Sequence, residues 1–188
     1  MSWKPSSVAN PPNKMRTLIL IPTETEAAPL RAACPDAPVR IAGVGMAAAA
    51  AATARIIAEE HPDRLILAGI AGASDCSVAV CEVVAVAGER IAELPGKYAV
   101  RYAADFIPAG LRTVESNTTN RTGVAASGTQ IENMEGAAFL AVCRAFGVPG
   151  AEVRAVSNYT DDPRSAWRIE ESAEKLAKTI IRILSDYE

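Results

Sequence analysis

Hydrophobic residues in this chain form short aliphatic runs that alternate with longer amphipathic stretches. The aliphatic runs predict strands at Arg16–Ile21, Val39–Ala42, Leu65–Ala68, Val78–Ala87, Leu111–Glu115 and Ala151–Ser157. The amphipathic stretches predict helices at Glu24–Ala33, Met46–Glu60, Gln130–Phe146 and Ser165–Ser185. The strands are aliphatic rather than alternating in pattern, which is typical of parallel strands covered on both faces. The pattern therefore predicts an α/β fold with a largely parallel sheet between two layers of helices.

The length of 188 residues suits a single domain with one hydrophobic core. We expect a flexible segment over residues 1–15, rich in Pro, Ser and Asn, and a domain over residues 16–188. The first segment lacks the apolar core of a signal peptide. No apolar run approaches the ~20 residues that a transmembrane helix needs. These features favour a cytoplasmic protein without a membrane partner.

The net charge and the few possible metal ligands argue against nucleic acid and metal ions as partners. A net charge of -3 and a pI near 5.3 do not suit general binding to nucleic acid. The four cysteines lack CxxC spacing, and the single histidine, His61, precedes Pro62 at a predicted helix end. A zinc site needs Cys and His ligands at closer spacing. We therefore expect no metal and no other cofactor.

One carboxylate, that of Glu135, falls on the predicted apolar face of a helix. Thr129 and Glu132 have the spacing of a capping box, which predicts a helix start here. The buried side would consist of Ile131, Ala138, Val142 and Ala145. A buried carboxylate costs roughly several kcal/mol unless it is paired or solvated. Its partner could be a ligand hydroxyl or a structural cation, or the side chain could face water at an edge.

Acidic and glycine-rich segments follow the predicted strands. In parallel sheets, ligands bind beyond the carboxyl ends of the strands. The segments at these ends are Glu24–Glu26, Gly43–Gly45, Gly69–Gly72 and Ser157–Tyr159. We expect them to converge on one rim, which Glu135 could also reach. Taken alone, Glu26 could equally be a first-turn acid that interacts with the helix dipole.

Gly43-x-Gly45-x-x-Ala48 matches the glycine pattern of dinucleotide-binding turns. The acidic residue that should end the next strand is missing, because Asp63 precedes that strand instead. A tight turn that lets the backbone approach a small ligand explains the glycines equally well.

Three motifs together resemble the nucleoside phosphorylase and nucleosidase superfamily. They are Ile19–Ala27 (ILIPTETEA), Gly69–Ala73 (GIAGA), and Asn133–Ala138 (NMEGAA) followed by Val153–Asn158 (VRAVSN). The resemblance spans most of Arg16 to Glu188, although Glu89–Thr129 is shorter than the family usually has. It implies a single-domain, three-layer α/β/α fold with a mixed, mostly parallel central sheet. It also implies a small-molecule nucleoside as substrate and a homodimer or higher homo-oligomer.

The resemblance assigns roles to individual residues. Glu26 would position and deprotonate water, and Asn158 would contact the purine. Glu135 would bind ribose hydroxyls, so we expect it to be half-exposed with no Arg or Lys bound to it. The remaining substrate-binding residues would be Ile70, Ala71, Gly72, Met134 and Tyr159. Tyr159, like Phe139, could instead belong to the core.

Two positions bear on the reaction and the substrate. Phosphorylases of this family usually have an Arg at the position of Leu67 and a Ser or Thr at that of Ile70, so the resemblance favours water over phosphate as nucleophile. Asn158 offers a donor and an acceptor, which suits a 6-oxopurine. The tail Ser157–Ile169 is most similar to the futalosine hydrolases, which release hypoxanthine in a menaquinone pathway. A phosphorylase, a methylthioadenosine/S-adenosylhomocysteine nucleosidase or a non-catalytic nucleoside-binding paralogue remain the alternatives.

Overall fold

The computed structural model describes residues 15–123 and 128–187, so the expected flexible segment lies outside it except for the exposed Met15. The strands are β1 (Thr17–Ile21), β2 (Val39–Ile41), β3 (Arg64–Ala73), β4 (Val83–Ile91), β5 (Tyr102–Ala103), β6 (Arg112–Thr118), β7 (Ile131–Asn133) and β8 (Gly150–Tyr159). The α-helices are α1 (Glu24–Ala33), α2 (Met46–Glu60), α3 (Gly136–Phe146) and α4 (Ile169–Ser185). Short 3-10 helices cover Gly96–Tyr98 and Arg164–Ala166. No helix in these described ranges is long and apolar enough to span a membrane.

The eight strands form one mixed, mostly parallel sheet, as the sequence predicts. Its order is β2-β1-β3-β7-β6-β4-β5, and β8 pairs with both β3 and β4. Strands β3, β7, β6, β4 and β8 therefore close into a barrel, a feature that the sequence pattern does not reveal. The antiparallel pairs are β3–β7, β4–β5 and β4–β8.

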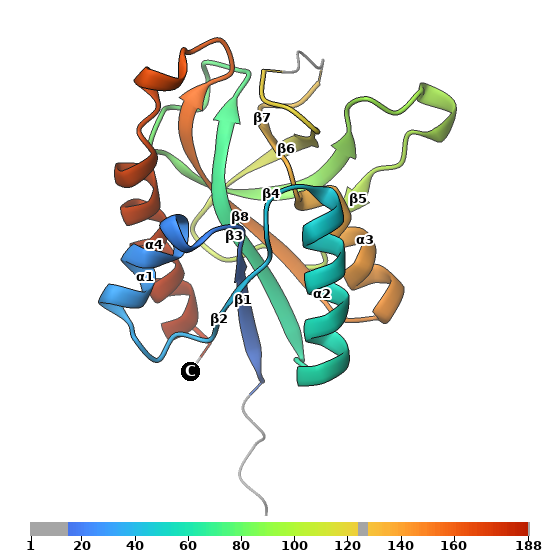
Figure 1. The fold of residues 1–188 in the computed structure, drawn as a ribbon, viewed down its shortest axis with the longest axis vertical. Coiled ribbons are helices and arrows are strands. Elements are labelled where there is room, and N and C mark those ends of the chain that lie inside the picture. The colour runs from blue at the N-terminus through green and yellow to red at the C-terminus, as the bar shows by residue number, and fades with distance from the viewer. Residues whose placement is uncertain (1–14, 124–127, 188) are drawn as a thin grey trace, which may run out of the picture.

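Helices cover both faces of the sheet and give the expected three layers. Helices α1 and α4 lie side by side on one face, and α2 and α3 lie on the other (Figure 1). The core on the α4 side is built on that helix's apolar stripe, which consists of Ala173, Leu176, Ala177, Ile180 and Ile183. Phe139, Leu140 and Cys143 of α3 pack into the opposite core. This arrangement leaves the carboxyl ends of β1, β3 and β8 at one edge of the fold.

Two predicted segments have a different conformation in the structure. Gly69–Ala73 continues β3 instead of following its end, because β8 pairs with it along its length. The strand predicted at Val78–Ala87 is displaced toward the C-terminus and is β4. Its expected first residues form a turn in which Cys81 adopts a positive φ of 68°. Pairing with distant strands determines where β3 and β4 begin and end. The local sequence pattern contains no information about that pairing.

The helix predicted at Gln130–Phe146 begins only at Gly136. Ile131–Asn133 is the strand β7, which pairs with β6 on one side and β3 on the other. The capping box at Thr129 and Glu132 is therefore wrong, because that segment is extended. Of the predicted buried side, Ile131 is buried, but in β7, whereas Ala138 and Val142 are half-buried and Ala145 is exposed. The buried residues of α3 are Gly136, Ala137, Phe139, Leu140 and Cys143.

Candidate active site

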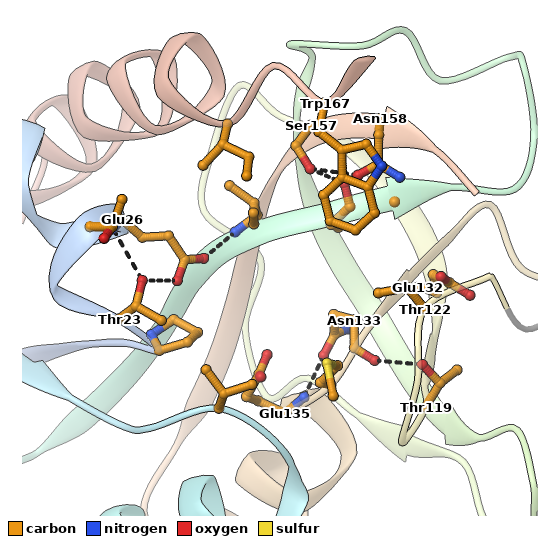
Figure 2. A pocket seen from close by; sticks show the side chains of 18 of the residues that line it. Thr23, Glu26, Thr119, Thr122, Glu132, Asn133, Glu135, Ser157, Asn158 and Trp167 are labelled. Carbon is orange, nitrogen blue, oxygen red and sulfur yellow. Dashed lines mark hydrogen bonds between the residues drawn. The ribbon is translucent and has the colours of Figure 1, made fainter. Parts of the chain in front are cut away.

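A cavity of about 330 Å³ opens where β1, β3, β7 and β8 end (Figure 2). Each of the segments that the sequence predicts at strand ends contributes residues to the lining of this cavity. Its lining consists of Pro22, Thr23, Thr25, Glu26, Val44, Ile70, Ala71, Gly72, Thr119, Thr122, Glu132, Asn133, Met134, Glu135, Ser157, Asn158, Arg164, Trp167 and Ile169. The expected convergence of Glu26, Gly72, Glu135 and Asn158 is thus present in the geometry.

Glu26 is held in the first turn of α1 with its carboxylate turned toward the cavity. The N-cap hydroxyl of Thr23 donates to Glu26 Oε2 across 2.6 Å and accepts from the Glu26 N–H at 3.2 Å. The N–H of Ile70 donates to Glu26 Oε1 across 2.9 Å. Glu26 is only 6% exposed. Each oxygen has one protein donor, and a carboxylate oxygen can accept a further hydrogen bond.

Glu135 lies directly before α3, at its N-cap position, rather than on a helix face. The N–H of Gly45 donates to Glu135 Oε1 across 3.0 Å. Gly43 and Gly45 have φ angles of +79° and +88°, which only glycine adopts easily, so the turn after β2 depends on them. In this chain the glycine turn therefore brings a backbone donor to a carboxylate.

Arg154 contacts the second oxygen of Glu135, which contradicts the expected absence of a cation. Arg154 Nη1 lies 3.3 Å from Glu135 Oε2 and also 3.3 Å from the carbonyl oxygen of Ile70. Glu135 is only 4% exposed and not half-exposed. In the sequence, Arg154 is one of two charged residues in a predicted strand, the other being Glu152. Only the register of β8 against β3 brings it under the cavity.

A buried polar cluster lies behind Arg154, inside the barrel. Arg154 Nε donates to Glu152 Oε1 across 2.7 Å, and Nη2 donates to Asn133 Oδ1 across 2.9 Å. The Asn133 amide donates to Glu89 Oε1 at 2.5 Å and to Glu152 Oε1 at 3.2 Å. Burial and then the charge of Glu152 raise the pKa of Glu89 well above its ordinary value. Burial also raises the pKa of Glu152, although Arg154 opposes that shift.

Glu132 and Asn158 flank a glycine on the cavity wall. Gly72 pairs with Glu132 of β7 on one side and with Asn158 of β8 on the other. A Cβ at residue 72 would lie 3.3 Å from Asn158 Nδ2 and 3.5 Å from Glu132 Cγ. The missing side chain therefore leaves a slot between a carboxylate and a carboxamide. Glu132 is a residue that the sequence reasoning missed, because it was placed on a helix.

Both side chains beside this slot are held by further hydrogen bonds. Glu132 Oε1 accepts from the N–H of Gly123 across 2.6 Å. The Ser157 hydroxyl donates to Asn158 Oδ1 across 2.7 Å, and Asn158 Nδ2 donates to the carbonyl of Tyr159 across 2.8 Å. One N–H of the Asn158 amide remains for other acceptors.

An aromatic wall from the segment before α4 completes the cavity. Trp167 lies beside Asn158 (Figure 2), and its indole N–H donates to the carbonyl of Asp162 across 3.3 Å. The Arg164 guanidinium lies 4.2 Å from the centre of the Trp167 ring. The sequence reasoning used this segment only for its resemblance and assigned no role to either residue.

Tyr159, an expected substrate-binding residue, and Phe139 do not line the cavity. Tyr159 packs against the apolar cluster that contains Ala71, Val84 and Val156. Phe139 is fully buried in the core between the sheet and α2 and α3. For both residues the structure supports the core interpretation.

Residues 110–187 match the family model described as the phosphorylase superfamily. This span contains β6, β7, α3, β8 and α4, and hence Glu132, Glu135, Arg154 and Asn158. Over this span, which is less than half of the chain, the sequence is similar to the phosphorylase superfamily. A segment of 60 residues is also 45% identical to futalosine hydrolase of Thermus thermophilus. That segment is 31% of this chain and 27% of the length of that protein.

Solved structures of a futalosine hydrolase and of two nucleosidases have the same fold. A futalosine hydrolase mutant of Helicobacter pylori superimposes with a TM-score of 0.82 at 14% identity, covering 92% of this chain and 99% of that chain. A 5'-methylthioadenosine/S-adenosylhomocysteine nucleosidase of the same organism gives 0.81 at 14% identity, with 93% and 100% covered. The corresponding nucleosidase of Neisseria meningitidis gives 0.79 at 20% identity, with 92% and 100% covered. These identities show a shared fold and do not discriminate between the two activities.

Proposed function

We propose that this protein hydrolyses the N-ribosidic bond of a purine nucleoside, with a substrate and product like those of futalosine hydrolase. The observation that carries the proposal is the placement of two carboxylates, Glu26 and Glu135, around one cavity whose wall also contains Asn158. Cleavage of a glycosidic bond through a cationic sugar typically uses two carboxylates near the scissile bond, and Asn158 adds an amide that can contact the base.

Glu26 is proposed as the general base. Its carboxylate is oriented by Thr23 and Ile70, and each oxygen retains capacity to accept a proton donor such as water. Glu26 would take a proton from water as the water oxygen bonds to C1′ of the ribose. The C1′–N bond breaks, its electron pair leaves with the purine, and the purine then takes up a proton.

Glu135 is proposed to bind the ribose hydroxyls. Its two oxygens are fixed by Gly45 and Arg154, so its position is set before a ligand arrives. Such preorganised groups stabilise the charge that develops at the transition state, here the positive charge on the sugar ring. Met134 lines the same cavity and would pack against the sugar.

Asn158 and Glu132 are proposed to contact the edge of the purine in the slot at Gly72. A 6-oxopurine carries an acceptor at O6 and a donor at N1–H, whereas adenine carries a donor at the 6-amino group and an acceptor at N1. The Asn158 amide can donate to O6 or N7, and the Glu132 carboxylate can accept from N1–H. The pair therefore favours hypoxanthine or guanine over adenine.

Water rather than phosphate is the proposed nucleophile. Phosphate binding needs cationic and hydroxyl donors around the anion. Leu67 is fully buried and apolar, and the N–H of Ile70 is already bound to Glu26. The guanidinium of Arg154 donates to Glu135, Glu152, Asn133 and Ile70. The carboxylates of Glu26 and Glu135 would also repel a phosphate ion.

The test is incubation of the purified protein with futalosine, inosine and methylthioadenosine, each with and without phosphate. Free bases are then separated by chromatography. The proposal expects hypoxanthine from futalosine at a rate that phosphate does not change. Strict dependence on phosphate would establish a phosphorylase instead. Preferred cleavage of methylthioadenosine would establish an adenine-specific nucleosidase, and no cleavage of any nucleoside would contradict an enzymatic role.

A further inference from the structure

Two buried carboxyl groups, Glu89 of β4 and Glu152 of β8, face each other inside the barrel and have no part in the proposed chemistry. Both side chains are fully buried. A Cβ at Gly136 would lie 2.5 Å from Glu89 Oε1 and 2.5 Å from Glu152 Oε2, so both oxygens converge on the start of α3. Only glycine leaves room for them there. Two ionised carboxylates at such a place would repel each other strongly.

One oxygen of this pair lacks a conventional donor. Among the residues that the structure describes, Glu152 Oε2 is the buried side-chain oxygen without an N–H or hydroxyl donor. A buried acceptor without a donor is costly. A proton on Glu89 supplies the donor, because a protonated carboxyl donates through its O–H. The same proton removes one of the two negative charges.

The remaining groups around Glu89 fit a neutral carboxyl. Ser116 and Thr118 of β6, Asn133 of β7, and Glu152 and Arg154 of β8 face it, and α3 approaches it with Gly136. Arg154 is the single cation in this set. It is adjacent to Glu152 at 2.7 Å and to Glu135 at 3.3 Å. With Glu89 neutral, Glu152 balances Arg154 and one negative charge remains on Glu135, next to the cavity.

We infer that Glu89 and Glu152 share one proton and act as positioning residues that fix Arg154, and through it the sugar-binding carboxylate Glu135. This inference rests on the proposed function, because it gives Glu135 its role at the ribose. Glu152 sets the orientation of the guanidinium through Nε. Glu89 orients Glu152. The side-chain amide of Asn133 forms hydrogen bonds with Glu89, Glu152 and Arg154. A second ionised carboxylate would draw Arg154 away from Glu135.

The variants Glu89→Gln, Glu89→Leu and Glu152→Gln test this arrangement. Glu89→Gln retains a donor toward Glu152, so we expect kcat/KM to stay within about threefold of wild type, whereas Glu89→Leu removes the donor and should reduce it by about tenfold or more. Glu152→Gln removes the charge that balances Arg154 and should act mainly on KM. In wild type, activity should fall at alkaline pH as Glu89 ionises, and Glu89→Gln should lack this limb of the pH profile.

A readout independent of turnover separates this inference from the proposed function. Difference infrared spectra of wild type at pH 7 should contain the carbonyl stretch of a protonated carboxyl group, and Glu89→Gln should lack it. Absence of that band in wild type would overturn the shared proton whatever the substrate is. An equal loss of kcat/KM in folded Glu89→Gln and Glu89→Leu would overturn the positioning role. A wild type that shows the band and cleaves no nucleoside contradicts the function and the role of the pair in it, but not the shared proton.

Discussion

Arg154 Nη1 lies 3.3 Å from Glu135 Oε2, so the carboxylate proposed to bind the sugar already has a cationic partner within the protein. The interaction uses one oxygen, and the N–H of Gly45 uses the other. Carboxylate oxygens can accept more than one hydrogen bond, so these contacts orient Glu135 without blocking it. The ion pair therefore serves to hold the group rather than to replace the ligand.

Replacing Glu135 with glutamine should weaken catalysis much more than it weakens the fold. The amide is nearly isosteric, but it lacks the charge that favours a cationic sugar and it leaves Arg154 with less compensation. We expect kcat/KM to fall by about a hundredfold, the usual order for one charge-stabilising group. Steady-state kinetics and thermal denaturation measure the two effects. Unchanged kcat/KM in a folded variant would remove Glu135 from the site.

Glu26→Gln should abolish turnover while it largely spares ligand binding. The amide cannot take a proton from water, and general-base catalysis typically contributes about 10² to 10⁴-fold. The neighbouring Glu24→Gln is the matched control, because Glu24 is in the same turn of α1 and is exposed. Turnover and calorimetric binding of a non-hydrolysable nucleoside analogue distinguish the two variants. Activity that survives in Glu26→Gln would show that another group activates the water.

The parts of the fold that follow from local chemistry could be read from the sequence. Helices α1 and α2 have the bounds that the sequence predicts. Thr23 caps the start of α1, and the glycine turn at Gly45 and the left-handed residue His61 delimit α2. Glu26 and Asn158 can be found from the sequence for a related reason. Each lies shortly after the end of a predicted strand.

The parts that depend on pairing between distant strands could not be read in this way. The pattern from Thr129 onward contains a good local helix signal, but β3 and β6 pair with Ile131–Asn133 and make it a strand. Closure of the barrel also results from pairing between strands that are distant in the sequence. The positions of Glu132 beside Gly72 and of Arg154 beneath Glu135 depend on strand register, which no local sequence signal specifies.

Glu132→Gln should change the choice of base more than the overall rate. Its side-chain carbonyl can still accept from Gly123, so the contact that holds this segment is retained. An amide can also donate to N1 of adenine, which a carboxylate cannot do. The ratio of kcat/KM for 6-oxopurine over 6-aminopurine substrates should fall by about ten- to a hundredfold, the order for one misplaced hydrogen bond. Equal losses for both substrates would show that Glu132 does not discriminate between the two bases.

The stability of the protein should depend on pH through Glu89. Burial raises the folded-state pKa of Glu89 above the ordinary value of 4.5, so the unfolded state loses its proton first as pH rises. The stability associated with the neutral group is therefore present below pH 4.5 and is lost progressively toward the raised pKa. Glu89→Gln does not ionise, so its melting temperature relative to wild type should increase as the pH rises from 5 to 8. The exposed Glu174→Gln is the control, and it should show no such trend. A constant difference for Glu89→Gln would mean that Glu89 is ionised in the folded state.

Gly69→Ala should disturb both sides of the candidate site at once. A Cβ at residue 69 would lie 2.6 Å from Arg154 Nη1 and 3.2 Å from Glu26 Oε1, so both groups lie this close to residue 69 only because it is glycine. Arg154 is fully buried and cannot move away freely, and overpacking of this kind costs about 1–3 kcal/mol. Gly96→Ala is the matched control, because a Cβ at residue 96 would meet no atom within 4 Å beyond its chain neighbours. Chemical denaturation and steady-state kinetics should show a loss of stability and of kcat/KM in Gly69→Ala only. If Gly69→Ala retains full activity, the close approach of Arg154 and Glu26 to residue 69 is not needed for catalysis.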